Sequence, residues 1–173
     1  LVAGNETTTT VLTHAARILA TRSDLFDMLR AGPERIPAYV DEVLRLESPI
    51  QGFWRTARTN AVVGDVTIPA GAQVLILYGS GNRDGEVFAE PDRLDLDRAS
   101  NRAHLAFGTG AHYCLGAHLA GAEGRIEGER MVATIERLDL RDGHESVPVP
   151  SFLLHGVKSL WLRLETTPHG EMR

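Results

Sequence analysis

The only cysteine of the chain, Cys114, lies at the end of a glycine-rich stretch and at the start of a helical pattern. The stretch FGTGAHYCLG covers residues 107–116, and the helical pattern continues to about residue 138. One cysteine excludes an internal disulfide, and it excludes a structural zinc site built from several thiolates. It fits a reducing compartment, so we expect a cytoplasmic protein. A chain of 173 residues is still long enough to bury a sizeable apolar core.

The apolar spacing predicts helices first and short strands afterwards. Steps of three and four residues predict helices over 1–19, 25–31 and 37–46. After Pro49 the spacing changes to that of strands separated by turn residues. The predicted strand pieces are 55–60, 61–63, 66–68, 73–77, 138–140, 151–155 and 159–164. This order predicts a mainly α fold with a minor β portion.

Residues 79–105 show little periodicity and form a long loop. A loop of this length is either functional or disordered. Its apolar residues Phe88, Leu94 and Leu96 indicate a loop that packs against the rest of the chain.

Charge and hydropathy exclude two classes of partner. The chain carries 18 Lys and Arg against 23 Asp and Glu, a net charge of −5. Nucleic-acid binding requires clustered positive charge, so no nucleic-acid partner is expected. No apolar run approaches the about 20 residues that a membrane helix needs, so no membrane partner is expected either.

The position of Cys114 suits a reactive or metal-binding thiol. A helix N-terminus lowers a thiol pKa, and Gly108 and Gly110 allow the backbone to turn its amides toward the sulfur. Taken alone, a lone cysteine is more often a buried structural residue, and His112 is more often an ordinary loop histidine. A thiol hydrolase that pairs Cys114 with a histidine is a further alternative. His112 is only two residues away, however, and no orienting acid is evident.

The glycine-rich stretch resembles the haem-binding loop of the cytochrome P-450 family, the haem-thiolate monooxygenases. The matching residues are Phe107, Gly108, Gly110, His112, Cys114 and Gly116. The resemblance implies that Cys114 is the thiolate ligand of the iron in haem b (heme b, iron protoporphyrin IX). It also implies that Phe107 packs beside the sulfur, and that His112 reaches a haem propionate.

The segment from Ala3 to Thr7 resembles the family's oxygen-binding helix, with the pattern A-G-x-[DE]-T. The resemblance implies that Thr7 and Glu6 are catalytic and deliver protons to bound dioxygen. It also implies that Ala3 and Gly4 line the space where oxygen and substrate approach the helix. Without the resemblance, the same residues would be a solvated, threonine-rich helix.

Glu42 and Arg45 match the family's E-x-x-R signature. Taken alone, charged residues three apart are usually a weak surface pair. Apolar neighbours suggest partial burial, and the resemblance implies a structural pair joined by a third basic residue from the long loop. We expect that residue to be Arg93.

Residues after the E-x-x-R helix match the family's cofactor and substrate contacts. Arg55 is expected to bind a haem propionate through its two-pronged guanidinium. Taken alone, apolar strand edges are more often plain core. The resemblance implies that four such residues line the distal pocket: Ile50, Phe53, Phe152 and Leu153.

The helix after Cys114 departs from the family. Gly121 and Gly124 stand where larger residues are usual, and Gly128 adds a third glycine to the helix. A glycine inside a helix costs about 0.5–1 kcal/mol relative to alanine. We therefore expect this helix to be weakened.

The chain opens inside a helical pattern and without a methionine. We expect it to be the C-terminal haem-binding part, residues 1–173, of a single bacterial-type P-450 domain whose N-terminal half is absent. The resemblance implies that the complete enzyme inserts one oxygen atom into a small organic substrate, with electrons from a ferredoxin- or flavodoxin-type partner. Two alternatives are a peroxide-using haem-thiolate enzyme and a truncated, non-catalytic remnant. The isolated chain is expected to be inactive.

Overall fold

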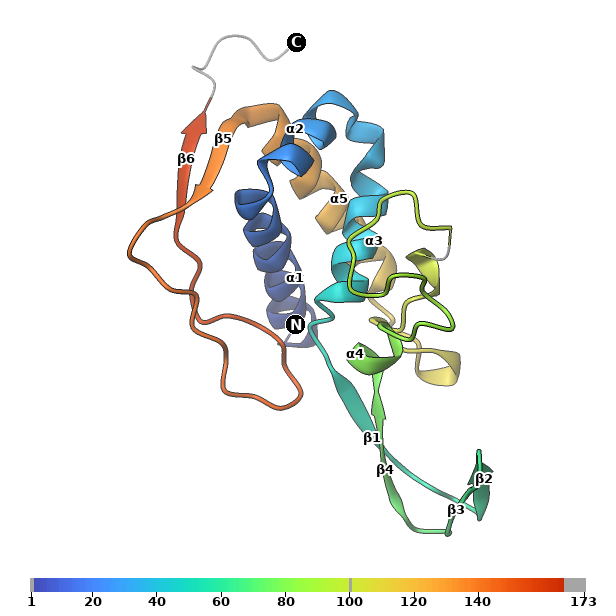
Figure 1. The fold of residues 1–173 in the computed structure, drawn as a ribbon. Coiled ribbons are helices and arrows are strands. Elements are labelled where there is room, and N and C mark those ends of the chain that lie inside the picture. Colours follow the sequence, from blue (N-terminus) through green and yellow to red (C-terminus); the bar gives the residue numbers. More distant parts are fainter. Residues whose placement is uncertain (1, 100, 167–173) are drawn as a thin grey trace.

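Three long helices pack side by side at the centre of the molecule (Figure 1). They are α1 (Val2–Thr21), α3 (Ile36–Leu46) and α5 (Ala117–Thr134), in a computed structural model that describes residues 2–99 and 101–166. The shorter α2 (Ser23–Ala31) and the 3-10 turn η1 (Pro33–Arg35) connect α1 to α3. The remaining short helices are α4 (Tyr78–Gly81), η2 (Asn101–Ala103) and η3 (Gly110–His112).

The strands form three separate two-stranded antiparallel sheets. The first pairs β1 (Gly52–Thr56) with β4 (Gln73–Leu77), and the second pairs β2 (Ala61–Val63) with β3 (Val66–Ile68). The third pairs β5 (Ile135–Leu140) with β6 (Leu162–Thr166). The predicted class, mainly α with a minor β portion, is confirmed.

Several predicted boundaries are wrong. Helix α5 ends at Thr134 rather than at 138, because residues 135–140 pair with β6. The strand predicted over 55–60 lies at 52–56 instead. The piece predicted over 151–155 is no strand, although Leu154 makes one isolated bridge with Ile50.

In the threonine-rich part of α1, hydroxyl groups bond back to the helix. Thr7, Thr9 and Thr13 donate to the carbonyl oxygens four residues earlier, at 2.6, 2.8 and 2.7 Å. These bonds satisfy polar side chains that otherwise compete with helix formation.

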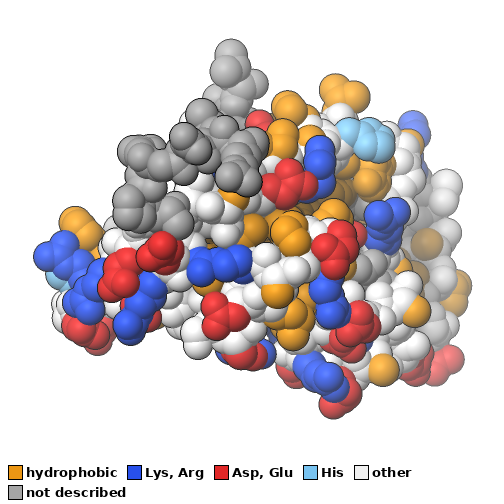
Figure 2. All heavy atoms as spheres, turned by 90° about the horizontal axis from the view of Figure 1, so that it is seen from above, with side chains coloured by type: hydrophobic (Ala, Val, Ile, Leu, Met, Phe, Trp, Pro, Cys, Tyr) orange, Lys and Arg blue, Asp and Glu red, His pale blue; other side chains and the backbone are white. Residues whose placement is uncertain are grey.

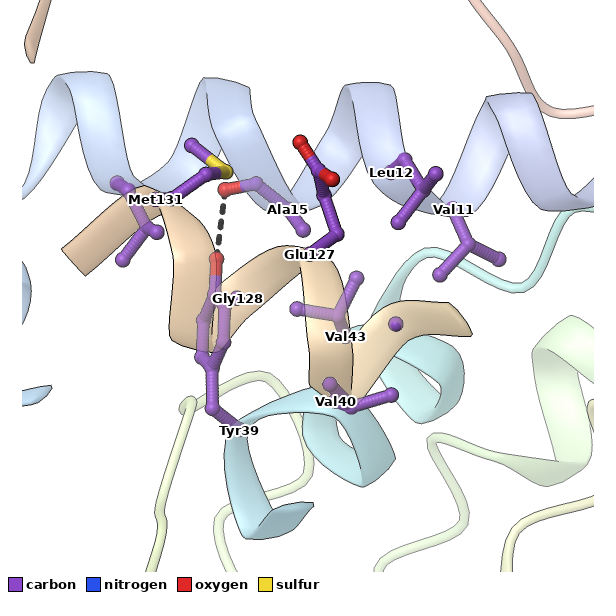
Figure 3. Close-up of a pocket in the computed structure, with 11 residues that line it drawn as sticks. Val11, Leu12, Ala15, Tyr39, Val40, Val43, Glu127, Gly128 and Met131 are labelled. Atoms are coloured by element: carbon purple, nitrogen blue, oxygen red, sulfur yellow. Dashed lines mark hydrogen bonds between the residues drawn. The ribbon is translucent and has the colours of Figure 1, made fainter. Parts of the chain in front are cut away.

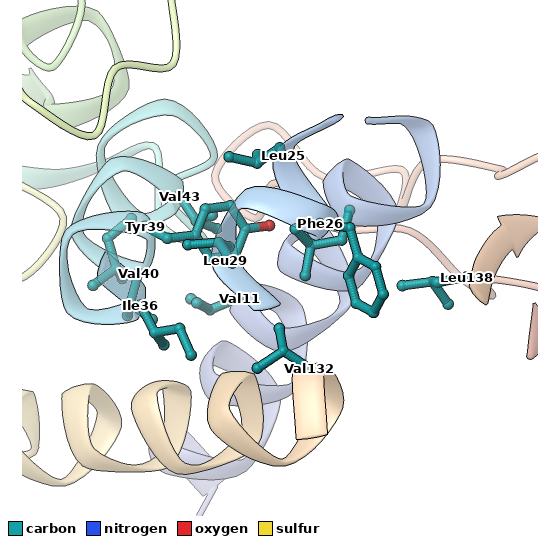
Figure 4. Packing of buried hydrophobic residues seen from close by; sticks show 12 residues of the cluster. Val11, Leu25, Phe26, Leu29, Ile36, Tyr39, Val40, Val43, Val132 and Leu138 are labelled. Carbon is teal, nitrogen blue, oxygen red and sulfur yellow. The ribbon is translucent and has the colours of Figure 1, made fainter. Parts of the chain in front are cut away.

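The apolar core lies where α1, α2, α3 and α5 meet β5 (Figure 4). Phe26 of α2 reaches toward Leu138 of β5, while Tyr39 crosses from α3 to donate a hydrogen bond to the Ala15 carbonyl at 2.6 Å. The buried members of the core are Val11, Leu19, Leu25, Phe26, Leu29, Ile36, Tyr39, Val40, Val43, Leu44, Val132 and Leu138. Leu94 and Leu96 of the long loop pack against this core, as their apolar character predicts.

Two glycines of α5 lie where the helix packs against α3, beside the pocket drawn in Figure 3. A Cβ on Gly124 would lie 2.9 Å from Cγ1 of Val40, and one on Gly128 would lie 2.8 Å from Cγ2 of Ile36. A Cβ on Gly121 would meet open space. The expectation that glycines only weaken α5 is therefore corrected for Gly124 and Gly128. At these two positions the absence of a side chain allows α5 to pack against α3.

No helix in the described part of the chain is long and apolar enough to span a bilayer. Figure 2 shows acidic and basic side chains interspersed over one face, in keeping with the net charge of −5. On the face drawn, mixed charge of this kind is typical of a solvated surface.

Candidate active site

The Cys114 loop has a backbone path that requires glycine at two positions. Gly108 and Gly110 have φ values of +68° and +70°, in the left-handed region that other residues rarely adopt. The amide of Cys114 donates to the Phe107 carbonyl at 2.9 Å and closes the loop. Helix α5 begins soon afterwards, at Ala117. The loop therefore holds Cys114 in a fixed position ahead of a helix.

The thiol of Cys114 is exposed. The alternative of a buried structural cysteine is therefore wrong. Among the described residues the thiol has no hydrogen-bonded histidine or acid, so the dyad of a thiol hydrolase is not formed.

Apolar surface surrounds the exposed thiol. Leu115 is fully exposed and Leu119 is 64% exposed at the start of α5. Phe107 is half-buried, and its ring centroid lies 6.3 Å from that of Tyr113, which is itself 54% exposed. Exposed apolar patches of this kind mark binding surfaces.

Tyr78 connects Arg55 to the Cys114 loop. Arg55 donates to the Tyr78 hydroxyl at 3.3 Å and to the Trp54 carbonyl at 2.9 Å. A Cβ on Gly108 would lie 3.6 Å from the same hydroxyl. The structure therefore places the predicted Arg55 beside the loop, while His112 is exposed in η3. Tyr78, which the sequence analysis missed, has no motif that could have identified it.

Glu42 and Arg45 form a fully buried ion pair. Arg45 donates to both carboxylate oxygens, at 2.7 and 2.9 Å. Its remaining N–H groups donate to the backbone oxygens of Asn82 at 2.9 Å, of Pro91, and of Arg93 at 3.0 Å. All five guanidinium donors therefore have acceptors, which offsets the cost of burying the charge.

Arg98, and not Arg93, is the third basic residue at this pair. Nε of Arg98 lies 3.2 Å from Oε1 of Glu42, and the Arg98 side chain is 5% exposed. This contact is an ion pair without an aligned hydrogen bond at Nε. The Arg93 side chain is 61% exposed and pairs with Glu90 at 2.7 Å. The expectation for Arg93 is wrong, because a turn from Glu90 to Arg93 directs its carbonyl, and not its guanidinium, to Arg45.

Asn82 joins this buried pair to the Cys114 loop. Its backbone oxygen accepts from Arg45, and its side-chain amide donates to Oγ of Ser48 at 2.7 Å. Its side-chain oxygen accepts from the amide of Leu105, which precedes the loop. This role is not predictable from the sequence, since a single asparagine in a loop without periodicity gives no signal of burial.

The N-terminal part of α1 carries the predicted acid and alcohol. Glu6 is exposed and Thr7 is half-buried, and the Thr7 hydroxyl donates to the Ala3 carbonyl. Ala3 and Gly4 are exposed. Among the described residues, no hydrogen bond or ion pair joins Glu6 or Thr7 to the Cys114 loop.

Two chain segments carry the residues predicted to line a pocket. Ile50 bridges to Leu154, and the Leu153 carbonyl accepts from the Gln51 amide at 2.8 Å. Phe53 is 48% exposed and Phe152 is 73% exposed. The structure brings the two segments together at Ile50 and leaves both phenylalanine rings with apolar surface in solvent.

Comparisons with known proteins point to one family. A family model described as Cytochrome P450 matches residues 1–134. Cytochrome P450 144 of Mycobacterium tuberculosis is 43% identical over 124 residues, which is 72% of this chain and 29% of the relative.

Two solved structures are similar over most of this chain. The substrate-free structure of Mycobacterium marinum cytochrome P450 CYP150A6 matches with a TM-score of 0.92 and 34% identity, over 96% of this chain and 43% of that one. CYP109E1 from Bacillus megaterium in complex with testosterone matches with a TM-score of 0.89 and 34% identity, over 93% of this chain and 44% of that one. The chain spans less than half the length of these proteins. It belongs to the cytochrome P450 family and covers part of the fold.

Proposed function

We propose that the complete protein containing this chain is a monooxygenase that uses haem b, with Cys114 as the thiolate ligand of the iron. The observation that carries the proposal is the exposed thiol on a loop whose positive φ values at residues 108 and 110 favour glycine. Haem would fit the residues present, since an exposed sulfur that can bind iron has exposed apolar side chains as its neighbours in the chain. When bound, haem with a thiolate ligand supplies the activation of dioxygen.

Arg55 and His112 bind the two carboxylates of the cofactor in this proposal. Arg55 suits a carboxylate because its guanidinium presents paired donors, and the Tyr78 hydroxyl holds it beside the loop. His112 is exposed in η3, two residues before Cys114. The glycines of the loop, together with Gly116, leave space for close approach of a ligand to the backbone.

Thr7 acts as a hydrogen-bond acceptor in this proposal. Its hydroxyl proton is directed at the Ala3 carbonyl, so its oxygen lone pairs remain for a donor in the pocket. Glu6 is exposed and is suited to pass protons from solvent toward that position. The two residues together hold and supply protons on the substrate side, next to Ala3 and Gly4.

The substrate we propose is a small, mainly apolar organic molecule. Phe53 and Phe152 present apolar surface, with Ile50 and Leu153 at the junction between their segments. The steroid complex of CYP109E1, a relative of similar fold, supports this class of substrate. Electrons come from a ferredoxin- or flavodoxin-type donor in the cytoplasm. The 173-residue chain alone is inactive, because activated oxygen would be quenched without a closed distal pocket.

The test is the source of the oxygen atom in the product. The complete protein, supplied with a reductase, a ferredoxin and dioxygen labelled with oxygen-18, is expected to place one labelled atom in the product and the other in water. Product that forms with hydrogen peroxide alone, and not with dioxygen and reductant, would contradict a monooxygenase and favour the peroxide-using alternative.

A further inference from the structure

A cluster of two histidines and a carboxylate shares no residue with the Cys114 loop. His14 of α1, Glu47 at the end of α3 and His155 of the C-terminal segment bring one ligand atom each within 4.8 Å of one another. Nδ1 of His14 lies 3.3 Å from Oε2 of Glu47, and Nδ1 of His155 lies 3.6 Å from the same oxygen. Tetrahedral ligands about 2.0–2.1 Å from zinc are separated by about 3.3 Å, which these two distances approach.

The hydrogen bond made by Nε2 of His14 leaves Nδ1 as the nitrogen with a lone pair. Its Nε2 donates to the backbone carbonyl of His155 at 3.0 Å. Nδ1 therefore carries a lone pair in the neutral ring, and it faces a carboxylate oxygen that also carries only lone pairs. Metal-binding histidines usually donate their second N–H to a carboxylate, a backbone carbonyl or water, as Nε2 of His14 does to the His155 carbonyl.

The cluster is held in place by backbone contacts. The amide of Glu47 donates to the Val43 carbonyl at 2.8 Å, at the end of α3. The amide of His155 donates to the Pro49 carbonyl at 2.8 Å, so the C-terminal segment is fixed to the chain just after Glu47. His14 is 1% exposed, whereas the His155 side chain is 43% exposed. His155 is therefore the ligand that can move to shorten the widest separation.

Arg17 is the group that competes with a cation. Its NH2 lies 3.2 Å from Oε1 of Glu47 and 3.3 Å from Nδ1 of His14. The contact with Oε1 is compatible with a metal on Oε2, because ligating carboxylates are commonly hydrogen-bonded on their other oxygen. The contact with Nδ1 must break. The Arg17 side chain is 33% exposed, so it can turn toward solvent.

We propose that His14, Glu47 and His155 bind a divalent transition-metal ion of the zinc class, with a water molecule as fourth ligand. Two imidazoles and one carboxylate are a donor set that zinc accepts. The ion would connect α1, the end of α3 and the C-terminal segment at a place that the proposed haem chemistry does not use.

The test is titration with Zn²⁺ of the complete protein that contains this chain, without an affinity tag. Every sample carries Cys114→Ser, because an exposed thiol would itself bind zinc. We expect one zinc ion per chain by calorimetry and a rise in the melting temperature with excess zinc. Cobalt is expected to give the visible bands of a tetrahedral site.

Three further variants identify the ligands. His155→Ala should weaken binding by at least about tenfold, while its backbone carbonyl still holds His14. His118→Ala, at another exposed histidine, should leave the affinity unchanged. Arg17→Met should tighten zinc binding severalfold, because it removes the donor that competes for Nδ1 of His14. Such a gain of affinity cannot be explained by loss of folding.

Three results would overturn the proposal. The first is no binding of zinc to the parent chain at excess metal. The second is equal affinity in the parent and in His155→Ala, with unchanged circular dichroism. The third is loss of binding in His118→Ala, which would place the metal on the surface of α5.

Discussion

Arg45 donates hydrogen bonds to both carboxylate oxygens of Glu42, and neither side chain has any exposed surface. Glu42 also accepts a hydrogen bond from the amide of Asp95 at 2.9 Å. Arg45 donates to three backbone carbonyl oxygens of the long loop. One buried ion pair thus fixes a loop that has little regular secondary structure.

Replacing Glu42 by alanine leaves the Arg45 charge buried without its partner. We expect Glu42→Ala to lower the free energy of unfolding by about 3–5 kcal/mol, and to leave little folded protein. Urea denaturation followed by circular dichroism measures this loss. Glu90→Ala, which removes an exposed pair with Arg93, serves as the control and should cost less than about 1 kcal/mol.

Arg98 and Arg93 make a second matched comparison. Arg98→Ala removes the buried guanidinium that contacts Glu42 and should lower stability by about 1–3 kcal/mol. Arg93→Ala keeps the carbonyl that Arg45 uses and should stay within about 0.5 kcal/mol of the parent. Equal losses in the two variants, measured by the same denaturation, would contradict the assignment of Arg98.

The glycines of α5 should respond in opposite directions to alanine. Gly124→Ala introduces a Cβ 2.9 Å from Val40 and should destabilise the protein by about 1–3 kcal/mol, despite the better helix propensity of alanine. Gly121→Ala meets open space and should stabilise it by about 0.5–1 kcal/mol. Melting temperatures of both variants decide the point; a stabilising Gly124→Ala would show that α3 and α5 are not in close contact there.

Thr7 is expected to couple the use of reductant to product formation. Thr7→Val in the complete protein keeps the side-chain shape and deletes the hydroxyl. It should consume reductant at a similar rate but release hydrogen peroxide in place of oxygenated product. Parallel assays of reductant, peroxide and product measure the ratio. Fully coupled turnover in this variant would exclude the proposed role of Thr7.

The helices were predictable because their apolar spacing and their breaks are local. Gly32 and Pro33 end α2 where the sequence predicts, and α3 spans 36–46 against a prediction of 37–46. The end of α5 was not predictable, because residues 135–138 leave the helix only by pairing with β6, more than twenty positions along the chain.

The candidate site likewise contains residues that a local pattern reveals and residues that depend on distant contacts. The Cys114 loop and the Glu42–Arg45 pair have fixed spacings that a sequence reveals. Arg98 was missed because the turn at Glu90, with its positive φ of 47°, decides which side chain of the loop faces inward. Asn82, Tyr78 and the His14 cluster depend on contacts between distant segments, which no local pattern indicates.

The central claim is that the thiol of Cys114 binds the haem iron. The most direct measurement is the absorption spectrum of the reduced carbon monoxide complex, in the haem-loaded protein and in its Cys114→Ser variant. We predict that the parent shows the red-shifted Soret band of a thiolate ligand and that the variant lacks it. A variant that binds haem and keeps the Soret position of the parent would contradict the assignment of Cys114 as the ligand.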